Sequence, residues 1–210
     1  MPDSYCHFHI VRHAQSEGNV KGIVQGHADY PLTELGRTQA QSCSIELSTI
    51  AFDDAFSSDL LRTVETAEII ATKHQIAVTS TQLLREQNFG KFNGASVQMF
   101  EDELDALLAK HRSLALEQRF SHRAHPEIES DEEMMTRMIP FLRSTALTNL
   151  DKNILIVSHG SIMRTLLVRL GYASFEQLTH SAIGNCGYIK LDSDGVDFFI
   201  CSTHGVTVGA

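Results

Sequence analysis

A chain of 210 residues is long enough to bury the core of one domain and short for two. Its composition, with 42% hydrophobic residues, 20% charged residues and four prolines, is typical of a globular protein and excludes a long linker or disordered tail. The formal net charge of -9 argues against nucleic acid or an anionic membrane surface as a partner. We therefore expect a single domain over residues 1–210, in which a local basic pocket attracts any anionic ligand.

The first residues, Met1 to Ser4, lack the basic and apolar regions of a secretory signal, and no stretch is long enough for a transmembrane helix. The four cysteines form no CxxC pair, which argues against a zinc knuckle or a redox pair; they are Cys6, Cys43, Cys186 and Cys201. We expect reduced thiols and a cytoplasmic location. No coiled-coil seam is apparent, so the sequence leaves the oligomeric state open.

The first half of the chain alternates between strand-like and helical patterns. Residues 5–11 predict a first strand, and residues 33–47 predict a helix with an apolar stripe. Residues 55–57 are expected to be the end of a short second strand. A helix follows over residues 61–71, where apolar residues recur at helical spacing, and Ser58 is placed to cap its N-terminus.

The middle of the chain is helical and polar over residues 96–122, which is typical of a segment that passes over a sheet rather than one that belongs to it. Ser130 followed by Glu133 forms a capping box and predicts the start of another helix. Helical spacing continues from there as far as residue 147.

The last third of the chain contains the pattern of the innermost strand. Residues 153–158 form a continuous apolar run, which a sheet covered on both faces requires. A helix is expected over residues 160–170. Residues 187–191 and 196–201 predict a terminal hairpin around an Asp-Gly turn.

Short strands that alternate with helices predict an α/β fold. We expect a three-layer α/β/α sandwich with a mostly parallel central sheet. Residues 96–129 are expected to form a cap-like helical insertion within the single domain.

Two histidines follow directly on predicted strands. Arg12 and His13 follow the first strand, and His159 and Gly160 follow the innermost one. Ligands of open α/β sheets bind at the carboxyl ends of the strands. Arg12 and Arg62, at two different strand-to-helix junctions, supply cationic donors that stay charged and can hold phosphate oxygens. The pattern therefore predicts a phosphate site at this edge.

These residues resemble the histidine phosphatase superfamily, in the phosphoglycerate-mutase-like group whose first strand ends in Arg-His-Gly. The resemblance spans nearly the whole chain and rests on blocks that occur in the same order as in the family. The blocks are IVRHAQSEGN from Ile10 to Asn19 with PLTELGRTQA from Pro31 to Ala40, SSDLLRTVETA from Ser57 to Ala67, REQNFGKFNG from Arg85 to Gly94, and VSHGSIMR from Val157 to Arg164. Ordered blocks of this kind are far more specific than a single Arg-His pair.

The resemblance, transferred position by position, implies a metal-independent phosphatase. His13 would be the nucleophile that forms a phosphohistidine, and Glu86 would be the general acid that protonates the leaving oxygen. Arg12, Arg62 and His159 would clamp the phosphoryl group. Further contacts to a small phosphorylated substrate would come from Asn19, Gln25, Gly26 and Gly160. The resemblance implies no metal and no cofactor.

One position departs from the family pattern, because Ala14 stands where a glycine usually follows the nucleophilic histidine. Alanine would be strained there if the backbone needs a positive φ, and little would change if the position needs only a small side chain. We expect a tolerated substitution.

Three functions fit the sequence. The first is a phosphomonoesterase that hydrolyses small phosphorylated metabolites, and the second is a phosphoglycerate mutase that uses the same phosphohistidine. The third is a non-catalytic regulatory module that keeps the phosphate pocket. The run Asn88-Phe89-Gly90 resembles the phosphatases more than the Tyr-Gly-rich segment of the mutases, which favours hydrolysis. The third function is least favoured because all the core polar residues are present.

Other polar and sulfur-containing residues are interpreted as structural. His7 and His9 share one strand face without a carboxylate or cysteine nearby in the sequence, so ordinary sheet-face histidines are favoured over a metal site. The methionines at 134, 135 and 138 are expected to pack in the core. Basic residues of the cap segment are expected to be solvated, with the alternative that one lines the substrate pocket or reaches a second anionic group of the substrate; they are His111, Arg112, Arg119, His122, Arg123 and His125.

Overall fold

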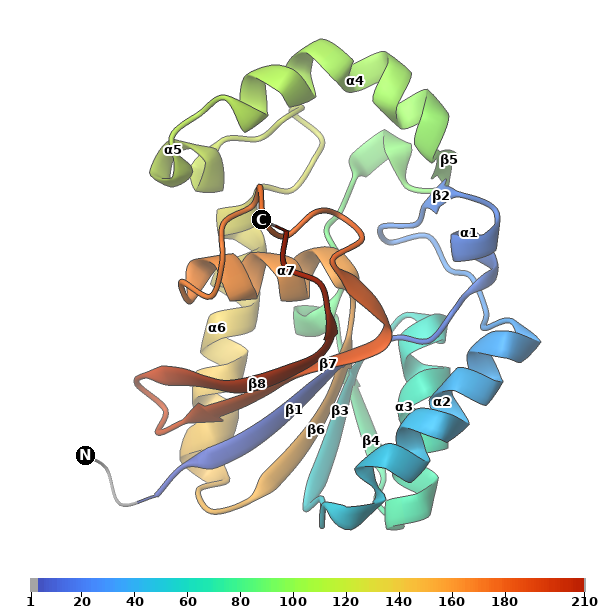
Figure 1. Cartoon of the computed structure of the whole chain (residues 1–210), viewed down its shortest axis with the longest axis vertical. Helices are drawn as coiled ribbons and strands as arrows, with labels where there is room; N and C mark the ends of the chain where they lie inside the picture. The colour runs from blue at the N-terminus through green and yellow to red at the C-terminus, as the bar shows by residue number, and fades with distance from the viewer. Residues whose placement is uncertain (1–3, 210) are drawn as a thin grey trace.

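Six strands form the central sheet of the computed structural model, which describes residues 4–209 (Figure 1). The strands are β1 (Cys6–Arg12), β3 (Asp54–Ser58), β4 (Val78–Thr81), β6 (Asn153–Ser158), β7 (Ile183–Ser193) and β8 (Phe198–Val206). They lie in the order β4-β3-β6-β1-β7-β8. Residues 1–3, on which the prediction about a secretory signal partly depends, and residue 210 lie outside the described residues.

The sheet is mostly parallel, as predicted. β1 pairs in parallel with β6, β6 with β3, and β3 with β4. β7 pairs antiparallel with β1, and β8 pairs antiparallel with β7. In the register of β1 and β6, Arg12 lies opposite Ser158, so both strands end at the same edge of the sheet. The residues that follow β1, β3 and β6 are therefore brought close together.

Helices cover both faces of this sheet (Figure 1). The long ones are α2 (Glu34–Glu46) and α3 (Leu61–His74) on one face, and α6 (Asp131–Thr148) and α7 (Gly160–Arg169) on the other. The period-two alternation of strand side chains produces the two layers. Val11 and Val157 pack toward α2 and α3, whereas Ile10 and Ile156 pack toward α6 and α7. The predicted three-layer α/β/α sandwich is confirmed.

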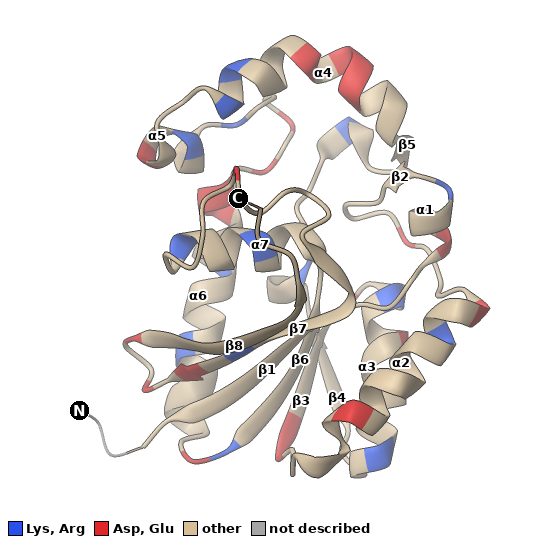
Figure 2. Cartoon of the chain, viewed as in Figure 1, with Lys and Arg blue, Asp and Glu red and all other residues tan. Residues whose placement is uncertain are grey.

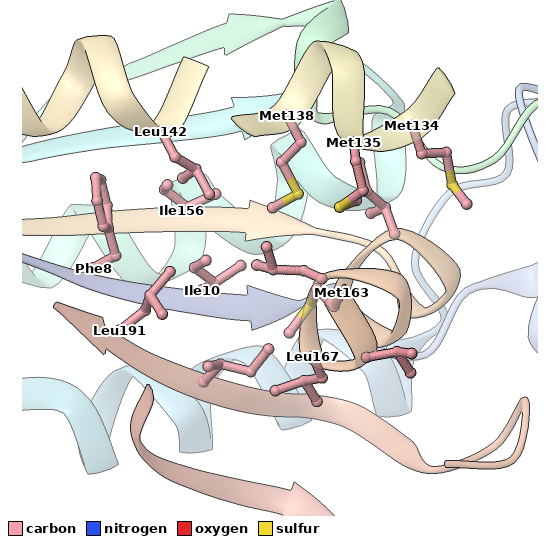
Figure 3. Close-up of a cluster of buried hydrophobic side chains, with 14 of the residues drawn as sticks. Phe8, Ile10, Met134, Met135, Met138, Leu142, Ile156, Met163, Leu167 and Leu191 are labelled. Atoms are coloured by element: carbon pink, nitrogen blue, oxygen red, sulfur yellow. The ribbon is translucent and has the colours of Figure 1, made fainter. Parts of the chain in front are cut away.

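The larger core lies between the sheet and the α6–α7 layer (Figure 3). Met134, Met138 and Leu142 of α6 belong to this core together with Phe8 of β1, and Figure 3 shows Met138 and Leu142 pointing toward the strands. All four side chains are fully buried, and Met135 is nearly so. The predicted packing role of these methionines is confirmed. Burying one such side chain contributes roughly 1.5–3 kcal/mol, so this layer anchors the strand ends that carry the polar site.

Further elements lie beyond the carboxyl ends of the strands. They are α1 (Glu17–Val20), β2 (Ile23–Val24), β5 (Ala95–Ser96), α4 (Val97–Arg112) and α5 (Leu116–Ser121), with 3-10 helices at Gln82–Leu84 and Gly90–Phe92. Another 3-10 helix, Leu47–Thr49, follows α2 and precedes β3. β2 and β5 form a separate two-stranded sheet. Figure 1 shows α4 and α5 at the top of the molecule, above α7. Phe92, Leu104 and Ile128 form a small apolar cluster of their own that supports this region.

Two local predictions need correction. Ser58 is the last residue of β3 rather than a helix cap, and α3 begins after Leu60, which has no side-chain capping bond. The terminal hairpin is longer than predicted, because β7 starts at Ile183. Polar and glycine residues interrupt the apolar pattern at the start of β7, so the sequence pattern did not reveal this part of the strand. The strand is also irregular there, and Cys186 has a φ of +59°. The capping box of Ser130 is present as predicted. No helix within residues 4–209 is long and apolar enough to cross a membrane.

Candidate active site

His13 lies immediately after β1 and is held by three hydrogen bonds. Its backbone N–H donates to Ser158 O (3.0 Å), and its carbonyl accepts from Asn185 Nδ2 (3.0 Å). The ring Nδ1 lies 2.7 Å from Ala14 O. A carbonyl can only accept, so Nδ1 carries the hydrogen and Nε2 keeps its lone pair. The ring is thus held in the tautomer that leaves Nε2 free to act as a nucleophile.

The surroundings of His13 keep its imidazole neutral. Burial lowers the pKa of His13 well below its ordinary value, and the positive charges of Arg62 and Arg12 lower it further, while the bond to Ala14 acts in the opposite direction. Desolvation and nearby cations both disfavour the imidazolium form. At neutral pH the side chain is therefore an unprotonated nitrogen base beside two guanidinium groups.

His159 follows β6 and faces His13, with the two ring centroids 5.4 Å apart and the planes at 63°. Burial, the charge of Arg62 and the neighbouring His13 hold the pKa of His159 well below its ordinary value. Among the described residues, neither ring nitrogen of His159 has a hydrogen-bond partner although both are buried. A buried polar atom without a partner is costly, and such atoms at a ligand site commonly bind the ligand.

Two arginines supply the positive charge of the site. Arg62, in the first turn of α3, donates from Nη1 to Ala28 O (2.9 Å) and from Nη2 to Gly26 O (2.8 Å). Arg12, the last residue of β1, donates from Nη1 to Ile183 O. Burial lowers the pKa of Arg62 to about 10, so its guanidinium stays charged at neutral pH. The Nε atoms of both arginines are buried and have no partner within residues 4–209.

Glu86 lies beside the start of α7. Its carboxylate accepts backbone N–H bonds from Ser161 (3.1 Å) and Ile162 (3.2 Å), groups that a helix N-terminus leaves free. The preceding Arg85 forms two hydrogen bonds of 2.7 Å with Asp59 in the β3–α3 loop. This ion pair ties the segment that carries Glu86 to the loop that leads into α3.

The other expected substrate contacts lie around the same space. Asn19 Oδ1 accepts from Ser16 N (3.0 Å) in the capping box of α1, and Gln25 Oε1 accepts from Ser16 Oγ (2.8 Å). Gly26 has a φ of +47°, a backbone conformation that favours glycine. A Cβ at Gly160 would lie 3.3 Å from the Nε of Arg12, so glycine permits this close approach.

Ala14 is buried and does not have a positive φ, since within residues 4–209 only Gln75, Asp151 and Cys186 do so among non-glycine residues. Its N–H donates to Thr66 Oγ1 (3.1 Å). The backbone strain considered for alanine at this position is therefore absent, and the position requires only a small side chain.

A cavity of about 370 Å³ joins these groups. Eight of the nine residues singled out in the sequence line it, namely Arg12, His13, Asn19, Gln25, Gly26, Arg62, Glu86 and Gly160. His159 is fully buried and meets the site through its ring contact with His13. The chain thus brings together a neutral nitrogen nucleophile, two fixed cations and a carboxylate, a set suited to phosphoryl transfer.

The sequence interpretation of the cap segment was partly wrong. Arg119 is only 8% exposed and lines the cavity, as do the half-buried His111 and His122. Arg112 is exposed as expected but also lines the cavity. Arg123 is exposed and pairs with Glu133. Sequence spacing gave no signal for Arg119, because its burial depends on contact with a segment more than fifty residues away.

The histidines of β1 have partners that the local sequence does not reveal. His7 Nδ1 lies 2.7 Å from Asp192 Oδ1 on the neighbouring β7, and His9 packs edge-on against Phe52. Within the described part of the chain, no three His, Cys, Asp or Glu side chains are grouped so that they could hold a metal ion.

Comparison with known proteins points to one family. A model of the histidine phosphatase superfamily (branch 1) matches residues 8–203. A 2,3-bisphosphoglycerate-dependent phosphoglycerate mutase from Cytophaga hutchinsonii is 33% identical over 177 residues, which cover 81% of this chain and 80% of that protein. A protein from Hydrogenobacter thermophilus, provisionally named phosphoserine phosphatase 2, is 31% identical over 189 residues, or 89% of each chain. The structure of a phosphoglycerate mutase from Bacillus anthracis has a TM-score of 0.84 at 23% identity, covering 97% of this chain and 95% of that one, which is a likeness of fold.

Proposed function

We propose that this chain, which belongs to the histidine phosphatase superfamily (branch 1), is a phosphomonoesterase that hydrolyses small phosphorylated metabolites through a phosphohistidine on His13. The observation that carries the proposal is the state of His13: a buried, neutral imidazole whose Nδ1–H is bound to Ala14 O. This leaves Nε2 unprotonated beside the guanidinium groups of Arg12 and Arg62.

In the first step, Nε2 of His13 attacks the phosphorus and the bond from phosphorus to the leaving oxygen breaks. Arg12, Arg62 and His159 hold the equatorial oxygens and offset their negative charge. Glu86 gives a proton to the leaving oxygen. In the second step, water attacks the phosphohistidine, Glu86 takes a proton from that water, and inorganic phosphate and neutral His13 are regenerated.

We assign the remaining residues of the cavity to substrate positioning. Asn19, Gln25, Gly26 and Gly160 contact the phosphorylated substrate. Residues 96–129, which contain α4 and α5, act as a cap over the site, so that the shape of this segment selects the substrate. The same proposal includes two further claims: hydrolysis needs no metal or cofactor, and the protein is cytoplasmic.

The second candidate is a phosphoglycerate mutase, which is favoured by the 33% identity to the mutase from Cytophaga hutchinsonii. Both activities use the same phosphohistidine and differ in whether water or a bound phosphoglycerate accepts the group. The Asn88-Phe89-Gly90 run after Glu86 supports hydrolysis, because the mutases usually carry a Tyr-Gly-rich run there.

The test is phosphate release from p-nitrophenyl phosphate and a panel of metabolite phosphates in EDTA, for the wild type and His13→Ala, beside a mutase assay on 3-phosphoglycerate. EDTA-resistant hydrolysis that the substitution abolishes, with negligible mutase turnover, supports the phosphatase. Dominant mutase turnover selects the second candidate. Phosphate binding without any turnover leaves the third function, a non-catalytic regulatory module.

A further inference from the structure

The segment that carries Glu86 is held by an arginine that lies outside the active-site cavity. Arg137 belongs to α6 and follows the acidic first turn of that helix, which Figure 2 shows in red at the upper end of the helix. It lines a second cavity of about 410 Å³ and is not among the residues that line the active-site cavity. Any effect of Arg137 on the reaction must therefore pass through the residues that it contacts.

The guanidinium of Arg137 binds the backbone of the Glu86 segment and a carboxylate at the same time. Nη1 donates to Leu83 O (3.0 Å) and Nη2 donates to Glu86 O (3.0 Å). Nε and Nη2 also donate to the Glu129 carboxylate, at 2.8 and 3.1 Å. The side chains of Arg137 and Glu129 are only 17% and 16% exposed. A bidentate pair that is shielded from water fixes its geometry more firmly than a surface ion pair does.

Glu129 holds the chain on the other side of Glu86. Its Oε2 accepts from Asn88 N (3.0 Å), and its backbone carbonyl accepts from Gln87 Nε2 (2.7 Å). Its backbone N–H donates to Asn88 O (2.8 Å). Arg137 and Glu129 together therefore grip the chain before and after Glu86, and we call this ion pair the Glu86 clamp.

The position of the Glu86 backbone decides where its carboxylate lies. The carboxylate accepts from the N–H groups of Ser161 (3.1 Å) and Ile162 (3.2 Å) at the start of α7, and from Gln87 N (2.9 Å). These bonds require the Glu86 segment and α7 to keep a fixed separation. A misplacement of about 1 Å can cost about 100-fold in rate, even when its cause is remote from the reacting atoms.

We propose that Arg137 is a positioning residue for Glu86, and that the Glu86 clamp sets where the carboxylate meets the leaving oxygen of the substrate. The inference rests on the proposed function, because it takes Glu86 to be the general acid. Arg137 acts on proton transfer to the leaving group and not on the binding of the phosphoryl group.

The kinetic test compares a substrate with a poor leaving group, glycerol 3-phosphate, with one that has a good leaving group, p-nitrophenyl phosphate. Arg137→Gln should lower kcat for glycerol 3-phosphate by about 10- to 100-fold, which is part of the contribution of a general acid. The loss is partial because His27 Nε2 also donates to Glu86 O (3.0 Å). The kcat for p-nitrophenyl phosphate, KM and inhibition by inorganic phosphate should change little. Arg137→Lys keeps the charge without the planar fork and should show a smaller loss of the same kind.

A double variant shows whether Arg137 acts through Glu86. In the Glu86→Gln background, Arg137→Gln should cause no further loss of kcat for glycerol 3-phosphate, because the acid that it positions is already absent. Losses that multiply in the double variant would overturn the inference. So would an Arg137→Gln variant whose kcat falls equally on both substrates or on neither.

The matched control is another ion pair between two elements, on the opposite face of the sheet. Arg37 of α2 donates from Nε to Glu65 Oε1 of α3 (2.6 Å), and neither residue lines the active-site cavity. Arg37→Gln should have wild-type kinetics on both substrates. Both Arg37→Gln and Arg137→Gln are expected to lower the melting temperature, so a change in stability alone does not support a positioning role. If Arg137→Gln does not fold, Arg137→Lys takes its place in every measurement.

The amide proton resonances of Ser161 and Ile162 report the position of the Glu86 carboxylate without any turnover. Glu86→Ala removes the acceptor and gives the upfield shift for its complete loss. Arg137→Gln should move both resonances part of the way, and Arg37→Gln should leave them in place. If the wild type hydrolyses neither substrate, or if Glu86→Gln shows no dependence on the leaving group, the proposed function fails on these compounds. The two resonances then decide the inference: movement in Arg137→Gln supports it, and wild-type positions refute it.

Discussion

The side-chain amide of Asn185 donates a hydrogen bond to the backbone carbonyl of His13, with 3.0 Å between Nδ2 and O. The contact joins the start of the antiparallel β7 to the end of the central β1, next to the irregular residue Cys186. It holds in place the residue that we propose as the nucleophile, and no residue near His13 in the sequence could make it.

Asn185→Ala should leave the carbonyl of buried His13 without this partner. We expect the free energy of unfolding to fall by about 1–3 kcal/mol and kcat to fall with little change in KM, because the nucleophile is displaced rather than the phosphate contacts. Urea unfolding and steady-state kinetics measure the two effects. Asn149→Ala removes a similar bond, to Thr145 O (3.0 Å), far from the site, and should lower stability alone. Equal kinetic losses in both variants would contradict a positioning role for Asn185.

Glu86→Gln should lower kcat much more for substrates with poor leaving groups than for substrates with good leaving groups. The loss of the general acid is expected to reduce kcat by about 10²- to 10⁴-fold for alkyl phosphates, whose alkoxides need a proton to leave. The loss should be much smaller for p-nitrophenyl phosphate, because its phenolate leaves readily. Glu127→Gln, at an exposed carboxylate bound to Lys91 N (3.1 Å), is the control. An equal loss on both substrate types would argue against the acid role.

The buried histidines predict an acid-side loss of stability. The folded-state pKa values of His13 and His159 are held well below 6.5 by burial and by Arg62. As the pH falls below about 6.5, these two histidines bind protons in the unfolded chain but stay neutral in the folded chain. The free energy of unfolding therefore decreases, by up to about 1.4 kcal/mol per pH unit for each histidine. The double variant His13→Asn, His159→Gln should therefore show a shallower decrease between pH 6.5 and about pH 5. Urea unfolding at constant ionic strength tests this, and identical slopes would refute it.

Gly26→Ala should disturb the arginine that the Gly26 carbonyl holds. A Cβ at Gly26 would lie 1.9 Å from Asn93 Oδ1, and the φ of +47° adds strain of roughly 1–2 kcal/mol. We expect weaker competitive inhibition by inorganic phosphate, because the displaced carbonyl of residue 26 no longer holds Arg62 Nη2 in the same place. Gly22→Ala is the matched control, since its φ is +61° with nothing within 4 Å of the added Cβ. If both substitutions weaken phosphate inhibition equally, the close approach at Gly26 is not the cause.

The sequence by itself determined the layers and the edge of the sheet at which the candidate site lies. The apolar run over 153–158 indicated the strand that is covered on both faces, and the residues directly after β1 and β6 had to meet because parallel strands end at one edge. Local signals such as the capping box of Ser130 were equally readable, since they involve atoms only three residues apart. Ser58 failed as a cap because the preference of a residue for an N-terminus does not fix where a strand ends.

Only the tertiary structure decided which distant side chains complete the site. Arg119 is on a polar six-residue helix, and its burial depends on Phe175, which arrives from the segment after α7. Asn185 reaches His13 across 172 positions, and away from the site Asp192 reaches His7 across 185. Such contacts follow from strand order and from the path of the loops. The free energy of folding that selects these paths is a sum of many weak packing interactions. Periodicity reports which face of an element is buried, but it carries no information about which partner lies against that face.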